Sequence, residues 1–189
     1  MDNVALLQRT VDQIDRLTAD LNDSQLAAQT PCTEWRVRDL LNHITGGATM
    51  FAISAEQGSV PDDQVGQLMG GDNLGSDWKG AWSTASKRAV AVYNQPGVMD
   101  KIVKLPFGEM PAGIALSIAI FDVATHACDL AVATGQKVDD QELLGAALEM
   151  GKQMIGPDLR APGVFDAEQP CPAGASVEEQ LLAFAGRKV

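Results

Sequence analysis

The chain has 189 residues and a formal net charge of −11, with 25 acidic side chains against 14 basic ones. Nucleic-acid binding needs a basic face, and anionic membranes attract basic segments, so this charge argues against both kinds of partner. A hydrophobic content of 46% is ordinary for a globular protein, and the length suits one domain with a substantial core. We therefore expect residues 1–189 to form a single soluble domain.

The three cysteines, Cys32, Cys128 and Cys171, are odd in number and far apart. No C-x-x-C pair is present in the sequence, which excludes zinc-ribbon and thioredoxin motifs. The N-terminal segment begins acidic, with Asp2, and shows no secretion signal. Free thiols without such a signal are typical of a reducing compartment, so we expect a cytoplasmic protein.

Three helices are predicted in the first half of the chain. Apolar residues recur at spacings of three and four from Val4 to Leu21, which is typical of an amphipathic helix. A second helix is expected from Val37 to Gln57 and a third from about Ser76 to Asn94. Residues 58–77, rich in glycine and aspartate, are expected to form a loop, which is either a lid over a site or a solvated connector.

The second predicted helix contains an unusual glycine pair, Gly46-Gly47. A glycine inside a helix costs about 1 kcal/mol relative to alanine. Either the close approach of another helix or room for a ligand would explain the pair. It is equally consistent with a helix that simply tolerates the two glycines.

The second half of the chain alternates breaks with helical patterns. A Gln95-Pro96-Gly97 break ends the third helix. The elements expected after it are a short extended piece over 101–106, a turn over 107–111, helices over 113–135 and 139–155, an irregular tail over 156–176 and a short last helix over 177–185. Gly135 is the expected C-cap of the first of these helices. Together the elements predict an all-α bundle with long connections.

The apolar segment 113–135 is long enough to cross a membrane, but it contains Asp122, His126 and Asp129. Two carboxylates and an imidazole at that depth would cost several kcal/mol in lipid. We therefore expect this segment to be the core helix of a bundle.

The same three polar residues form the sequence's main functional signal. Asp122, His126 and Asp129 stand at i, i+4 and i+7, so they share one stripe of a helix. A polar stripe on a buried helix is costly unless a metal ion or a polar ligand compensates it. Asp122 and His126 can reach one ion, and His43 on another helix completes a set of two imidazoles and a carboxylate. Three ligands and an open position are typical of a catalytic metal site.

Asp129 lies one turn further on and is the predicted catalytic residue, expected to orient His126 or a substrate group, or to relay a proton. A lone Asp/His pair at i, i+4 is more often an ordinary hydrogen-bonded pair. Apolar surroundings favour the metal, because an ionised aspartate inside a core needs a cation. Cys128 points away from the stripe and is not counted as a ligand, and Trp35 and Trp78 are interpreted as core residues.

Four parts of the chain also resemble a known family. They are Thr30 to His43, Leu105 to Pro111, Phe121 to Gly135, and the tail from Arg160 to Phe165 together with Leu182 to Arg187. These motifs resemble the DinB-like superfamily, specifically the branch of the N-terminal metal-binding domain of mycothiol-dependent maleylpyruvate isomerase. The resemblance implies an up-up-down-down four-helix bundle with long crossover connections and an irregular C-terminal tail.

The resemblance also implies a divalent metal, usually zinc and sometimes nickel. His43 and His126 match ligand positions, and Asp122 stands where the isomerase has a glutamate. Cys128 stands where relatives often have tryptophan. The isomerase carries a second, C-terminal domain that helps form its active site, whereas this chain ends with the bundle. Dimerisation is common among such bundles, so a homodimer is expected, although the sequence names no interface.

Three functional readings follow. In the first, the protein is a metal-dependent S-transferase or isomerase that uses a small-molecule thiol, mycothiol, and an electrophilic substrate that the sequence does not identify. The metal stabilises the thiolate, which attacks the electrophilic carbon. In the second, the bundle binds metal without catalysis. In the third, the site has decayed, and Asp122 is hydrogen-bonded to His126 without a metal.

Overall fold

The computed structural model describes residues 2–160 and 166–189. Within these ranges there are seven α-helices and one two-stranded antiparallel sheet, and the all-α fold class predicted from the sequence is confirmed. Part of the tail motif, residues 161–165, lies outside the described residues. The chain divides into two compact units, one of Met1–Gln8 with Arg38–Ala119 and one of Arg9–Val37 with Ile120–Val189. That residues 1–189 form a single domain stays a prediction.

Two long helices each contribute to both units. α1 (Asn3–Thr18) begins in the first unit, and α5 (Ala112–Thr134) runs on into the second unit beyond Ala119. α5 is one continuous helix of 23 residues. It ends as the sequence predicts, because Gly135 adopts a φ of +70°, a left-handed conformation that favours glycine.

The first unit contains α2 (Val37–Gln57), α3 (Asp62–Gly70) and α4 (Trp78–Tyr93), followed by the hairpin of β1 (Ile102–Leu105) and β2 (Gly108–Pro111). The predicted second helix matches α2 at both ends, and the predicted third helix differs from α4 by no more than two residues at either end. β1 fulfils the predicted extended piece.

Two expectations for this unit were wrong. Residues 58–77 contain α3, which begins with Asp62 and Asp63, acidic residues that favour a helix N-terminus. None of the nine α3 residues is buried, so the sequence carries no apolar stripe to reveal the helix. Residues 107–111, expected as a turn, mostly form β2, where Gly108 pairs with Leu105.

The glycine pair in α2 has a packing explanation at one of its two positions. A Cβ on Gly46 would overlap the carbonyl oxygen of Leu68 and the side chain of Asn73. Asn42 on the same helix fixes the segment, since its side chain donates to Gly71 O at 2.9 Å and accepts from Asn73 N at 2.7 Å. Close approach therefore explains Gly46.

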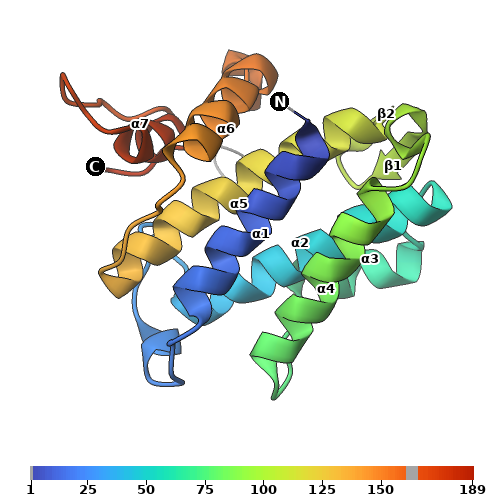
Figure 1. The fold of residues 1–189 in the computed structure, drawn as a ribbon, viewed down its shortest axis with the longest axis horizontal. Coiled ribbons are helices and arrows are strands. Elements are labelled where there is room, and N and C mark those ends of the chain that lie inside the picture. Colours follow the sequence, from blue (N-terminus) through green and yellow to red (C-terminus); the bar gives the residue numbers. More distant parts are fainter. Residues whose placement is uncertain (1, 161–165) are drawn as a thin grey trace. The chain divides into compact units, whose positions relative to one another are not determined.

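The second unit contains α6 (Gln141–Met154) and α7 (Val177–Phe184), which pack against each other (Figure 1). Asp140 caps α6 by accepting from Leu143 N at 3.0 Å. The rings of Phe121 and Phe184 meet edge to face with centroids 6.1 Å apart. A Cβ on Gly151 of α6 would overlap both rings, so a glycine there permits this contact.

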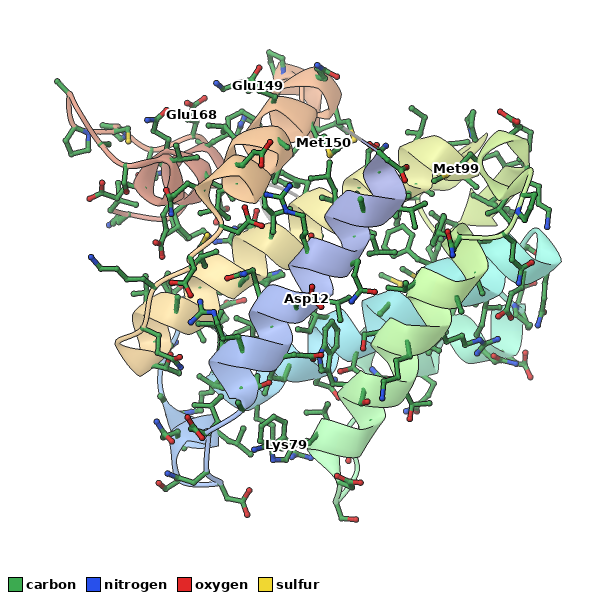
Figure 2. The ribbon with its side chains drawn as sticks, viewed as in Figure 1. Asp12, Lys79, Met99, Glu149, Met150 and Glu168 are labelled. Atoms are coloured by element: carbon green, nitrogen blue, oxygen red, sulfur yellow. The ribbon has the colours of Figure 1, made fainter. Side chains whose placement is uncertain are left out.

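Charged side chains lie on the outside of these helices. Asp12, Lys79 and Glu149, on α1, α4 and α6, are exposed (Figure 2).

Among the described helices, one is apolar and long enough to cross a membrane, with a mean hydropathy of 1.5 over its most apolar window. That helix is α5, and 78% of the window is buried within the protein. Such burial is the usual environment of a bundle's core helix.

Candidate functional site

His126 is the centre of a polar cluster in the second unit. Its side chain is 6% exposed and lies on α5. Nδ1 is 3.0 Å from Asp129 Oδ2, and Nε2 is 3.6 Å from Asp122 Oδ1. The ring of Trp35 lies against the imidazole, with centroids 5.4 Å apart and planes tilted by 30°. The structure therefore brings together the three residues that the helical spacing predicted.

Asp129 is an ionised carboxylate in a fully buried position. Its side chain has no exposed surface, and burial by itself would raise its pKa. The hydrogen bond and charge of His126, and those of Arg187, outweigh burial and hold the pKa of Asp129 below its ordinary value. An ionised carboxylate only accepts hydrogen bonds, so Nδ1–H of His126 donates to it. In the neutral imidazole with its proton on Nδ1, it is Nε2 that carries the lone pair, and this atom faces Asp122.

Arg187 supplies the cation that compensates Asp129. Its Nη2 donates to Asp129 Oδ2 at 2.8 Å and its Nε to Oδ1 at 3.2 Å. This two-pronged contact is the strongest geometry available to an arginine and a carboxylate. Arg187 is not among the site residues predicted from the sequence, although an aspartate on a buried helix requires a cation somewhere in the chain.

Cys32 is the second residue that the sequence analysis missed. Its Sγ accepts from Arg187 Nη2 at 2.9 Å and lies 3.7 Å from Asp129 Oδ2. Burial, followed by the charge of Asp129, raises the pKa of the Cys32 thiol to about 12, although Arg187 opposes the shift. Cys32 is therefore a neutral thiol here. Cys128, set aside as a ligand from the sequence, is buried, and burial raises its pKa as well.

A turn before α2 positions Cys32 and Trp35. Trp35 N donates to Cys32 O at 2.8 Å, and Thr30 N donates to Trp35 O at 3.2 Å. Trp35 was interpreted as a core residue, which was wrong. It is half-buried and packs on His126, because the turn directs its ring toward α5. Trp78 is buried, as predicted.

The spacing of Asp122 and His126 fits a shared cation better than a hydrogen bond. Their 3.6 Å separation exceeds hydrogen-bonding distance. Two ligand atoms bonded to one tetrahedral zinc ion lie roughly 3.3–3.5 Å apart, given bonds of about 2.0–2.2 Å. The side chain of Asp122 is 32% exposed, so a small molecule can reach this carboxylate from solvent. His43 lies half-buried on α2 of the other unit, and its part as a third ligand stays a prediction.

Comparisons with known proteins identify relatives of the whole chain. The family described as "Mycothiol maleylpyruvate isomerase N-terminal domain" matches residues 7–131. Two relatives are uncharacterised proteins of Mycobacterium tuberculosis, from strains CDC 1551 / Oshkosh and ATCC 25618 / H37Rv. Each is 36% identical to this chain over 191 aligned residues, and the alignment covers the full length of this chain and of the relative.

Solved structures of the mycothiol-dependent maleylpyruvate isomerase and of a histidine-to-alanine variant of it match the fold, each with a TM-score of 0.61 and 12% identity. The match covers 79% of this chain and 66% of the isomerase chain, just under two thirds of its length. This likeness confirms the DinB-like fold expected from the motifs.

Proposed function

This chain belongs to the mycothiol maleylpyruvate isomerase N-terminal domain family, and we propose that it is a metal-dependent enzyme that uses a small-molecule thiol. One observation carries the proposal. Nδ1 of His126 lies 3.0 Å from the buried carboxylate of Asp129, and Nε2 lies 3.6 Å from Asp122, at the spacing of two ligands of one cation. A metal-binding histidine is typically oriented by such a carboxylate at its other nitrogen.

The proposed ligands are His43, Asp122 and His126, and the ion is zinc or nickel. A divalent ion held there stabilises the thiolate form of a bound thiol near neutral pH. The residues provide two donor types that suit such ions, imidazole and carboxylate. The exposure of Asp122 supports an open coordination position, as catalytic sites require.

Asp129 is the residue that we predicted as catalytic. With His126 and Arg187 both donating to it inside the protein, it is suited to hold the imidazole in one tautomer. Its lack of exposed surface argues against direct contact with a substrate. We therefore assign it to positioning His126 rather than to proton relay. Trp35 provides an aromatic wall beside the imidazole.

The proposed reaction joins the thiol to an electrophilic carbon. The thiol loses its proton and its sulfur forms a bond to that carbon. In a transfer, a leaving group departs with the electron pair. In an isomerisation, the attacked carbon belongs to a double bond, and the electron pair of that bond moves onto the neighbouring conjugated atoms as the C–S bond forms. After rotation about the resulting single bond, the pair returns, the double bond re-forms and the thiolate leaves. Mycothiol is the proposed thiol because the family and the matching isomerase are both described by it. We also propose a cytoplasmic protein and a homodimer, with neither nucleic acid nor membrane as a partner.

A metal-binding bundle without catalysis is the competing function. The exposure of Asp122 favours the enzyme, because a purely structural zinc site is closed by four protein ligands. Adding thiols to the metal-loaded protein distinguishes the two functions. An enzyme of this kind is expected to gain thermal stability from mycothiol, since a ligand that binds the native state stabilises it.

The test of metal binding uses protein purified without a histidine tag. Elemental analysis and calorimetric titration with zinc are expected to give one ion per chain for the natural protein and none for His126→Ala. Glu149→Gln removes an exposed carboxylate on α6 and serves as the control, with binding unchanged. Absence of stoichiometric metal in the natural protein, or no loss on His126→Ala, would overturn the proposal.

A further inference from the structure

His126 offers a second group of metal ligands on its other side. The ligand atoms of Cys32, His126 and Asp129 all lie within 4.8 Å of one another. A sulfur, an imidazole nitrogen and a carboxylate oxygen form a donor set that suits zinc and other thiophilic ions. The imidazole therefore has two sides at which a cation could bind, Nδ1 beside Asp129 and Nε2 beside Asp122.

Arg187 already fills the Nδ1 side. Its Nη2 lies 2.9 Å from Cys32 Sγ and 2.8 Å from Asp129 Oδ2, so one nitrogen occupies the space between two of the three donors. The guanidinium carries a permanent positive charge. A metal ion there would need the same lone pairs and would meet a cation whose side chain is only 15% exposed. Displacing that cation would leave it buried without its partner, which is strongly destabilising.

The end of α7 holds Arg187 in place. Arg187 N donates to Leu182 O at 2.9 Å, and its Nη1 donates to Ala185 O at 2.7 Å. Gly186, just before it, adopts a φ of +90°, and a Cβ there would overlap the side chain of Asp166. The guanidinium is therefore fixed by its own backbone as well as by Asp129.

We propose that Arg187 is a positioning residue that decides which side of His126 binds metal. It closes the Nδ1 side by occupying the donors of Cys32 and Asp129, and it leaves Nε2 to the catalytic ion. This inference rests on the proposed function for the metal ion that binds at Nε2. The closure of the Nδ1 side depends only on the contacts that Arg187 makes with Cys32 and Asp129.

The test replaces Arg187 and follows cadmium binding. All variants carry Cys171→Ser, which removes the exposed cysteine. The protein with Arg187 is expected to show no thiolate-to-cadmium charge-transfer absorption. Arg187→Met, an uncharged side chain of similar length, is expected to gain one such band per chain, and adding Cys32→Ser is expected to abolish it. Arg88→Met, which removes a surface ion pair with Glu56, is the matched control and is expected to gain none.

Nitrogen NMR of the metal-free protein provides a second readout. The chain has two histidines, so His43→Gln assigns both imidazoles. With Arg187 present, His126 is expected to carry its proton on Nδ1. In Arg187→Met, cadmium is expected to move the Nδ1 resonance. If that variant fails to fold, Arg187→Gln, which retains donors without charge, is used in its place.

The outcomes separate the two proposals. A thiolate band in the protein that retains Arg187, a proton on Nε2 in that protein, or no band in a folded Arg187 variant would overturn the inference. If the Arg187 variant gains the band while the natural protein binds no metal at all, the proposed function fails and the inference survives.

Discussion

The contrast between Asp129 and Asp122 gives the sharpest prediction about the cluster. Asp129 has no exposed surface and bonds His126 and Arg187, whereas Asp122 is 32% exposed. Asp129→Asn keeps the shape of the side chain but leaves the buried guanidinium without its carboxylate. Breaking a buried ion pair in this way costs about 3–5 kcal/mol of unfolding free energy. Asp122→Asn changes a side chain that is partly exposed and is expected to change the free energy of unfolding by about 0.5 kcal/mol or less.

Urea unfolding of the metal-free proteins measures this difference, and zinc titration completes the comparison. Asp122→Asn is expected to lose the metal while keeping its stability, because it replaces a proposed ligand. Asp129→Asn is expected to lose stability and to bind zinc about 10–100-fold more weakly, the usual cost of losing a residue that orients a ligand. A loss below about 1 kcal/mol for Asp129→Asn, or an equal loss for both variants, would refute the reasoning.

Two further predictions concern the packing of the second unit. The hydrogen bonds of Arg9 lower the pKa of Asp140, so the pair stabilises the folded state above the unfolded pKa of about 3.9 and loses that effect as pH falls through the lower, folded pKa. Asp140→Asn keeps a helix-capping oxygen and is expected to lower the free energy of unfolding by about 1 kcal/mol at pH 6. Urea unfolding is expected to show that this loss shrinks below pH 4. A loss that does not depend on pH would contradict the prediction. Gly151→Ala is expected to lower the free energy of unfolding by about 1–2 kcal/mol. The added methyl group overpacks against two phenylalanine rings, and this effect outweighs the gain in helix propensity. Gly47→Ala, where a Cβ meets none of the described residues within 4 Å, is the control and is expected to be neutral or stabilising; equal effects would refute the packing argument.

The helices that bury an apolar stripe could be predicted from the sequence. α2 follows its periodic pattern from Val37 to Gln57, and α5 was recognised as a core helix despite its length. α3 could not be predicted in this way, because a helix without buried residues lacks that pattern. β2 was misread because its glycine and proline also favour turns, and only pairing with β1 reveals it as a strand.

The same division applies to the site. Asp122, His126 and Asp129 were found because a single helix fixes their spacing. Arg187 and Cys32 reach Asp129 from 58 and 97 residues away along the chain, and no local pattern links them. Burial of Asp129 predicts that a cation accompanies it, but tertiary structure decides which cation does so.

X-ray absorption at the zinc edge tests the central claim most directly. The claim is that zinc binds on the Nε2 side of His126, with nitrogen and oxygen donors and away from Cys32. Protein purified without a tag and loaded with one equivalent of zinc, in the absence of thiol, is expected to show only nitrogen and oxygen neighbours at about 2.0–2.2 Å. A sulfur neighbour at about 2.3 Å would contradict the account.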